Sequence, residues 1–175
     1  VQKMANKTAN ALRDLGLGLE DRVMMLMLDI PQFHGIFWGT IKMGAIPIPI
    51  NTMLTPTDYE FYLNDSRARL LVVSEELIQA VNDIEGDLPY LRDIIVISEV
   101  KGAHIPFKQK YKSASAMAKS AATTRDDVGL WLYSSGSTGS PKGAIHSQDD
   151  MVVTAKSYAQ GVLHLTEDDI CFSAA

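Results

Sequence analysis

The stretch that decides the fold and the site of this chain runs from Val128 to Gly143 and reads VGLWLYSSGSTGSPKG. Its first part, Val128–Tyr133, is a short unbroken apolar run, which is typical of a buried strand. The residues after Tyr133 are too polar and too rich in glycine to continue that strand, so they predict a loop. Gly143–His146 then predicts the start of a second strand. We therefore expect a loop that is held at both ends.

This loop brings hydroxyls, backbone N–H groups and one ammonium group to a single point. Such a combination suits a polyanion, above all a chain of phosphates. The spacing differs from Walker A, where the lysine directly follows a glycine, because Pro141 stands immediately before Lys142. A P-loop NTPase is therefore disfavoured. Many Ser/Gly-rich loops are only flexible linkers, but a linker needs neither Pro-Lys-Gly nor a strand on each side, so phosphate binding is the favoured interpretation.

Composition limits the class of protein. The chain has 175 residues, of which 46% are hydrophobic and 21% charged, as in a soluble globular domain. Its net charge of −5 argues against nucleic acid as a partner. No apolar run reaches the length of a membrane span, so no membrane partner is expected. The single cysteine, Cys171, excludes an internal disulfide, fits a reducing cytoplasm and is expected to be a buried structural residue.

Predicted strands and helices alternate along the chain. Apolar runs predict strands at 22–28, 69–74 and 94–98. Helical spacing and capping signals predict helices at 4–15, 33–43, 55–64, 75–81 and 148–160, the third beginning at Thr55 with Pro56 in its first turn.

Two further segments have their own character. Ala45–Ile50 has proline at every other position, which favours an edge strand or an extended segment over a central strand. Residues 101–127 are of mixed composition and are expected to cross the surface.

The alternation predicts an α/β fold with a mainly parallel sheet and flanking helices. In such sheets ligands bind at the carboxyl ends of strands, which is where the loop after Tyr133 is expected to lie. Core packing is the first interpretation of the methionines at positions 25, 27, 43 and 53. His34 lies in an amphipathic helix and is expected to be half-buried.

Ser134–Gly143 resembles the signature of the adenylate-forming superfamily, which includes acyl-CoA synthetases, luciferases and the adenylation domains of peptide synthetases. That signature is Thr/Ser-Ser-Gly-Thr/Ser-Thr-Gly-x-Pro-Lys-Gly, and every fixed position is met here. The resemblance covers nearly the whole chain. Ala11–Gly16 followed by Asp21–Val23 looks like the first helix and strand of the superfamily. Phe37–Gly39 with Lys42–Ala45 looks like its second helix and the turn after it.

Three stretches look most like benzoate-CoA ligases and their hydroxybenzoate and aminobenzoate relatives. They are Pro49–Tyr59, Asp65–Arg69 and Glu167–Ala175. The resemblance implies that residues 1–175 are a fragment of the large N-terminal, AMP-binding domain of such an enzyme, truncated at both ends and without the C-terminal domain.

The implied function is that of an ATP-dependent aryl-acid CoA ligase of the benzoate type. A carboxylate attacks the α-phosphate of Mg-ATP to give an acyl-adenylate and pyrophosphate, and the thiol of coenzyme A then displaces AMP. The implied partners are ATP, Mg²⁺, coenzyme A and a small aromatic carboxylate in the cytoplasm. Homo-oligomerisation of the parent enzyme is left open.

The resemblance also implies a set of nucleotide-binding residues. They are Ser134, Ser135, Gly136, Ser137, Thr138, Gly139 and Lys142. The hydroxyls donate hydrogen bonds, the glycines allow close backbone approach, and the lysine is a mobile point charge toward the β- and γ-phosphates. Thr138 is also expected near Mg²⁺, with a hydroxyl that faces only phosphate as the alternative.

No catalytic residue is expected within the chain. The ribose-binding Asp, the Tyr-Gly-x-Thr-Glu segment and the C-terminal catalytic Lys of the superfamily are all expected beyond Ala175. Gln148 departs from many relatives, which have a histidine there.

Two other functions stay open from the sequence. One is an acyl-CoA synthetase for fatty or short-chain acids, which a panel of acids would distinguish from an aryl-CoA ligase. The other is a non-catalytic nucleotide-binding module, which tight binding of ATP to the isolated chain would support.

Overall fold

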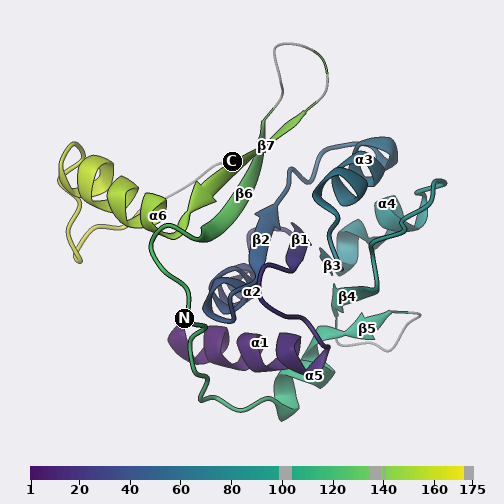
Figure 1. Cartoon of the computed structure of the whole chain (residues 1–175), viewed down its shortest axis with the longest axis horizontal. Helices are drawn as coiled ribbons and strands as arrows, with labels where there is room; N and C mark the ends of the chain where they lie inside the picture. The colour runs from purple at the N-terminus through teal and green to yellow at the C-terminus, as the bar shows by residue number, and fades with distance from the viewer. Residues whose placement is uncertain (99–103, 135–138, 140, 172–175) are drawn as a thin grey trace.

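A computed structural model describes residues 1–98, 104–134, 139 and 141–171 of this chain. Its body is a five-stranded, all-parallel sheet with the strand order β2-β1-β3-β4-β5 (Figure 1). The strands are β1 (Arg22–Leu26), β2 (Ile46–Pro49), β3 (Leu70–Ser74), β4 (Asp93–Ile97) and β5 (Ile105–Pro106). The predicted α/β class with a mainly parallel sheet is confirmed.

The central strands are buried on both faces, which explains why they are continuous apolar runs in the sequence. Alternate residues of β1 and β3 belong to two different clusters, because successive side chains of a strand point to opposite faces. One cluster contains Ala9, Leu12, Val23, Met25, Met27, Ile36, Met43, Ala45, Leu70, Val72, Ile95 and Phe107. The other contains Met24, Leu26, Ile48, Tyr59, Tyr62, Leu63, Ala68, Leu71, Val73, Val81 and Val96.

β2 lies at the edge of the parallel sheet, as its prolines predicted. Its residues pair with β1 from Arg22 opposite Ile46 to Met25 opposite Pro49. Proline has no N–H to donate to a ladder, so an edge position costs it no hydrogen bond on its open side.

The first face of the sheet is covered by α1 (Gln2–Asp14) and α2 (Pro31–Lys42), which pack closely against each other. The approach depends on Gly39 of α2. A Cβ added there would lie 2.6 Å from the Cβ of Thr8 and 2.8 Å from the carbonyl oxygen of Ala5. Glycine is therefore required at this helix crossing.

The second face carries α3 (Pro56–Ser66) and, after the 3₁₀ turn Glu75–Leu77, α4 (Ile78–Asn82). The predicted start of α3 is confirmed, with Pro56 in its first turn and a capping box between Thr55 and Asp58. The backbone N–H of Asp58 donates to Thr55 Oγ1 at 3.3 Å, and that of Thr55 donates to Asp58 Oδ2 at 3.0 Å. The bonds from Thr55 lower the pKa of Asp58, so the cap is charged at neutral pH.

Residues 104–127 have more structure than the sequence predicted. They form β5 and α5 (Phe107–Ser113), and the chain then runs along α1. Side chains of α1 donate to its carbonyl oxygens: Asn6 to Ala116 at 2.8 Å and Arg13 to Lys119 at 2.8 Å. This segment follows the surface, as expected, but its residues 111–119 accept hydrogen bonds from side chains of α1.

The C-terminal part is a hairpin followed by a helix. β6 (Val128–Ser134) and β7 (Lys142–Ser147) form a separate antiparallel sheet. α6 (Gln148–Thr154) starts at the predicted Ser147 cap and continues as the π-helical turn Ala155–Gln160. Figure 1 shows β6 beside β2, with α6 standing out from the body.

Several expectations about burial were wrong. Met53 is 89% exposed because it lies in the turn between β2 and α3 rather than in the core. His34 was expected to be half-buried and is exposed. Cys171 was expected to be buried and is also exposed. Within β6 only Gly129 and Leu130 are buried, because one hairpin cannot cover both of its own faces.

Within the described ranges, no helix is long and apolar enough to cross a bilayer.

We predict that Gly39→Ala destabilises the fold, although alanine is the better helix former. The added methyl group collides with Thr8 and with the backbone of Ala5, so the free energy of unfolding should fall by about 1–3 kcal/mol in urea titrations. His34→Ala, on the exposed side of the same helix, is the control and should change it by less than about 0.5 kcal/mol. A stabilised Gly39→Ala variant would contradict this packing.

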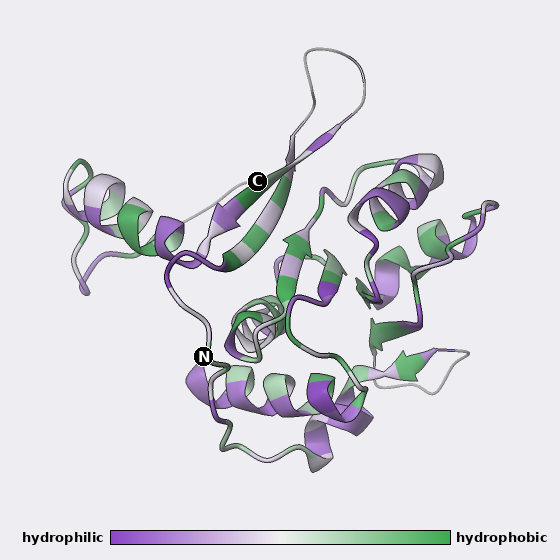
Figure 2. Cartoon of the chain, in the orientation of Figure 1, coloured by the Kyte–Doolittle hydropathy of each residue, from purple (hydrophilic) through white to green (hydrophobic). Residues whose placement is uncertain are grey.

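We also predict that the chain self-associates through α6 and the segment after it. No residue of α6 or of the π-helical turn is buried, and Val152, Val153, Val162 and Leu163 are exposed apolar side chains. Figure 2 shows hydrophobic (green) segments of ribbon along this helix. Sedimentation velocity at micromolar concentrations should show species larger than 19.2 kDa. Val153→Glu should reduce them, whereas Gln109→Glu, an equal charge change at an exposed site on α5, should not. A wild-type chain that is monomeric throughout would contradict the prediction.

Candidate functional site

The candidate site lies at the loop-bearing end of the β6–β7 hairpin. Register pairs run from Leu130 opposite His146 to Ser134 opposite Lys142. The last pair, Ser134 and Lys142, is the closing pair of the hairpin. Both closing residues are exposed, so a hydroxyl and an ammonium group stand at the same end of the strands. Sequence reasoning expected the loop at the carboxyl end of a parallel strand. That expectation was wrong, because β6 pairs with β7 in an antiparallel sheet of its own.

The predicted nucleotide-binding set divides into two groups. Ser134, Gly139 and Lys142 are described by the structure, and all three are exposed. The other predicted members, Ser135, Gly136, Ser137 and Thr138, lie outside the described residues. The expected role of Thr138 near Mg²⁺ lies outside them too.

Gly139 has φ of +110°, a backbone conformation that residues with a Cβ rarely adopt. No atom lies within 4 Å of the place where a Cβ would stand, so backbone geometry rather than space calls for glycine here.

Tyr133, the residue before Ser134, joins the hairpin to α3. Its ring stacks on that of Tyr62, with centroids 4.3 Å apart and planes 20° apart. Its hydroxyl donates to Asp65 Oδ2 at 2.5 Å. Burial, followed by the bond to the Asp65 carboxylate, raises the pKa of Tyr133 well above its usual value, so the phenol keeps its proton.

Gly143, opposite Tyr133 on β7, is covered by aromatic rings. A Cβ added to it would lie 3.3 Å from Cζ of Tyr133 and 3.6 Å from Cε3 of Trp131. The two rings therefore lie across the backbone that directly follows Lys142. From the sequence, this glycine was part of the signature and the start of the second predicted strand, without any indication of the ring packing. The aromatic residues at alternate positions of β6 were the signal that could have shown the packing.

The far end of β7 leads directly into α6. Ser147 caps the helix through a capping box with Asp150, whose pKa is lowered chiefly by its bond to the Ser147 hydroxyl. His146 Nδ1 lies 3.2 Å from Asp150 Oδ2. Gln148 Nε2 donates to the carbonyl oxygen of Val128 at 3.3 Å, so this side chain ties the helix start to β6.

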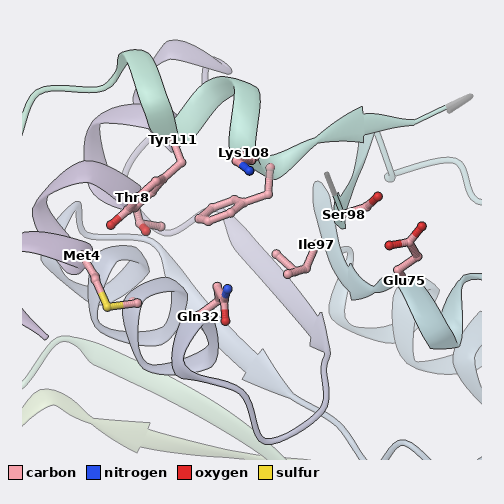
Figure 3. Close-up of a pocket in the computed structure, with 10 residues that line it drawn as sticks. Met4, Thr8, Gln32, Glu75, Ile97, Ser98, Lys108 and Tyr111 are labelled. Carbon is pink, nitrogen blue, oxygen red and sulfur yellow. The ribbon is translucent and has the colours of Figure 1, made fainter. Parts of the chain in front are cut away.

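A second concave region lies at the carboxyl ends of β3 and β4 (Figure 3). This cavity of about 430 Å³ is lined by Met4, Thr8, Gln32, Gly35, Glu75, Ile97, Ser98, Phe107, Lys108 and Tyr111. It has the size of a small-molecule site and lies where open parallel sheets bind ligands. Sequence reasoning missed it, because its walls come from five separate elements, and it contains none of the signature residues.

The donor set at the hairpin end fits an anion. Ser134 offers a hydroxyl, Lys142 a positive charge and Gly139, which is exposed, a backbone N–H. These three residues carry no carboxylate, so they suit phosphate oxygens rather than direct coordination of a metal ion. The fold and this site together define an α/β domain with a hairpin whose end carries donor groups that suit an anion.

Comparison with known families identifies the domain. The model of the AMP-binding enzyme family matches residues 1–175, and the chain belongs to that family of adenylate-forming enzymes. The chain is 42% identical to the benzoate-CoA ligase of Thauera aromatica over 97% of its own length, which is 32% of that protein. It is 35% identical to the 4-hydroxybenzoate-CoA/benzoate-CoA ligase of Rhodopseudomonas palustris over 94% of the chain and 30% of that protein.

A solved structure gives the same result. The anthranilate-CoA ligase AuaEII, crystallised with anthranoyl-AMP, superimposes with a TM-score of 0.92 at 37% identity. The match covers 96% of this chain and 33% of the ligase. The chain thus spans about a third of the length of the relatives that it matches.

Proposed function

We propose that this chain is part of the N-terminal domain of an ATP-dependent aryl-acid CoA ligase of the benzoate type. In this proposal the loop-bearing end of the β6–β7 hairpin binds the triphosphate of ATP during acyl-adenylate formation. The observation that carries it is the closing pair of the hairpin, in which Lys142 stands opposite Ser134 inside the family signature. The 42% identity to a benzoate-CoA ligase supports the choice of acid.

The proposed reaction has two steps. In the first, a carboxylate oxygen of the acid bonds to the α-phosphorus of ATP, the bond from that phosphorus to the bridging oxygen breaks, and pyrophosphate leaves. In the second, the sulfur of coenzyme A bonds to the acyl carbon, AMP leaves, and the thiol proton passes to solvent. The first step needs charge on the leaving pyrophosphate to be stabilised and its position to be fixed.

The residues at the hairpin end would meet the needs of the first step. Lys142 places its ammonium toward the β- and γ-phosphates and balances charge that grows on pyrophosphate. Ser134 donates its hydroxyl to a phosphate oxygen, and Gly139, whose φ is positive, allows close backbone approach to the ligand.

The other members of the signature complete the proposed triphosphate-binding site. Ser135, Ser137 and Thr138 add hydroxyl donors, and Gly136 allows close backbone approach. Mg²⁺ bound to the triphosphate would neutralise part of its charge, and Thr138 is the proposed residue beside it. A cytoplasmic enzyme agrees with the presence of one cysteine.

We predict that Lys142→Ala in the full-length enzyme slows benzoate-dependent pyrophosphate release by roughly tenfold to a thousandfold, the scale of comparable electrostatic contacts. Thioester formation from supplied benzoyl-adenylate should change much less, because pyrophosphate has already left. Lys156→Ala, which removes an equal charge from the exposed π-helical turn, is the matched control. Equal losses in both half-reactions would assign Lys142 a folding role instead.

We further predict that residues 1–175 alone turn over nothing. A hydroxyl and one exposed charge in water contribute little, and the described part of the site has no enclosing wall. The assay measures pyrophosphate release and consumption of coenzyme A with Mg-ATP and benzoate, beside the full-length enzyme. Turnover near the rate of the full-length enzyme would overturn the proposal that the site is completed by other parts of that enzyme. The same assay of the full-length enzyme with a panel of fatty and short-chain acids would show whether benzoate or one of these acids is the preferred substrate.

A further inference from the structure

The closing pair of the hairpin is linked to the body of the domain through Tyr133, its immediate neighbour. Tyr62 and Asp65, which contact Tyr133, are three residues apart on α3 and so lie on one face of that helix. Tyr62 supports the ring and Asp65 accepts from the hydroxyl at 2.5 Å, a length typical of a charge-assisted bond. The stacking contact fixes the plane of the Tyr133 ring, and the hydrogen bond fixes the position of its hydroxyl group.

The same ring also reaches the other side of the loop. Gly143 lies opposite Tyr133, and the absent side chain leaves room for the ring to cross the strand. The backbone on each side of the loop is thus held by one side chain: Ser134 directly follows Tyr133, and Lys142 directly precedes Gly143.

The helix that holds Tyr133 is itself well fixed. Tyr62 is 7% exposed and Leu63 only 2% exposed, and both belong to the second core cluster. The capping box fixes the start of α3, and Ser66 Oγ donates to the carbonyl oxygen of Tyr62 at 2.6 Å near its end. A side chain that docks on this face therefore takes its position from the core of the domain.

Position matters at this point because lysine is a flexible point charge. A displacement of about 1 Å in a group that contacts a reacting phosphate can cost as much as a hundredfold in rate. The Cα of Lys142 is fixed by its pairing with Ser134, and that pair is fixed through Tyr133.

We propose that Tyr133 is a positioning residue for the nucleotide site, held by Tyr62 and Asp65, and that it sets where Ser134 and Lys142 meet the triphosphate. The inference rests on the proposed function. It goes beyond the phosphate loop itself, since Tyr62 and Asp65 lie on α3, 71 and 68 residues before Tyr133 in the sequence.

The test uses the full-length enzyme and substitutions that preserve shape. Tyr133→Phe keeps the ring and removes the hydroxyl, so kcat/KM for ATP in benzoate-dependent pyrophosphate release should fall by roughly three- to tenfold, the value of one lost hydrogen bond. Asp65→Leu removes the acceptor and should give the same loss. Asp65→Asn keeps an acceptor oxygen and should restore most of the activity. The double variant of Tyr133→Phe with Asp65→Leu should be no worse than either single variant.

The controls separate positioning from folding. Thioester formation from supplied benzoyl-adenylate should stay within about twofold in each variant, because that step does not use the leaving pyrophosphate. Tyr90→Phe removes a hydroxyl from an exposed tyrosine elsewhere and should change nothing.

Each other outcome has a definite meaning. If the wild-type enzyme makes no aryl-CoA, the proposed function fails and this inference fails with it. If the wild type is active and Tyr133→Phe matches it, the inference alone is overturned. Parallel losses in both half-reactions that follow a drop in Tm would likewise overturn it, since they would show a purely structural role.

Discussion

The contact of the Tyr133 ring with α3 is the constraint on which the candidate site depends. The ring stacks on Tyr62, its hydroxyl donates to Asp65, and its face covers Gly143 on the opposite strand. A two-stranded hairpin is only marginally stable by itself. It gains a fixed position here because an aromatic side chain from one strand crosses the other and docks on a helix of the body. The site residues at the end of the hairpin take their places from that contact.

The parallel sheet supplies the base for this arrangement. Burial of β1 and β3 on both faces creates two core clusters, and α3 belongs to the second, which partly buried Trp131 and Tyr133 of the hairpin also contact. Packing of the sheet therefore positions α3, α3 positions Tyr133, and Tyr133 positions the neighbouring pair of Ser134 and Lys142. The face of α3 that carries Tyr62 and Asp65 therefore connects the phosphate-binding residues of the proposed site to the core of the sheet. The end of a hairpin needs such a support if the one positive charge there, that of Lys142, is to be placed accurately.

Local patterns predicted most of the elements of the fold and fewer of the contacts. The prolines of β2 and the cap at Thr55 follow from backbone chemistry within a few residues, and both predictions were confirmed. β5 and α5 were not predicted, because Phe107 is buried by other elements and the next stretch is held by side chains of α1. The signature predicted the phosphate loop, and Gly143–His146 predicted the second strand. The antiparallel pairing of that strand with β6 and the bond of Tyr133 to a residue 68 positions away were not predicted, because both depend on contacts between elements.

The central claim is that Lys142 faces the phosphates of ATP, and a reactive nucleotide tests it most directly. An ATP derivative with an acyl group on its γ-phosphate transfers that group to an amine in contact with the phosphates and releases ATP. With the full-length enzyme and peptide mapping, the account predicts that Lys142 is the principal modified lysine of this chain and that excess Mg-ATP suppresses the modification. Labelling spread evenly over exposed lysines such as Lys119 and Lys156, and unchanged by Mg-ATP, would contradict it.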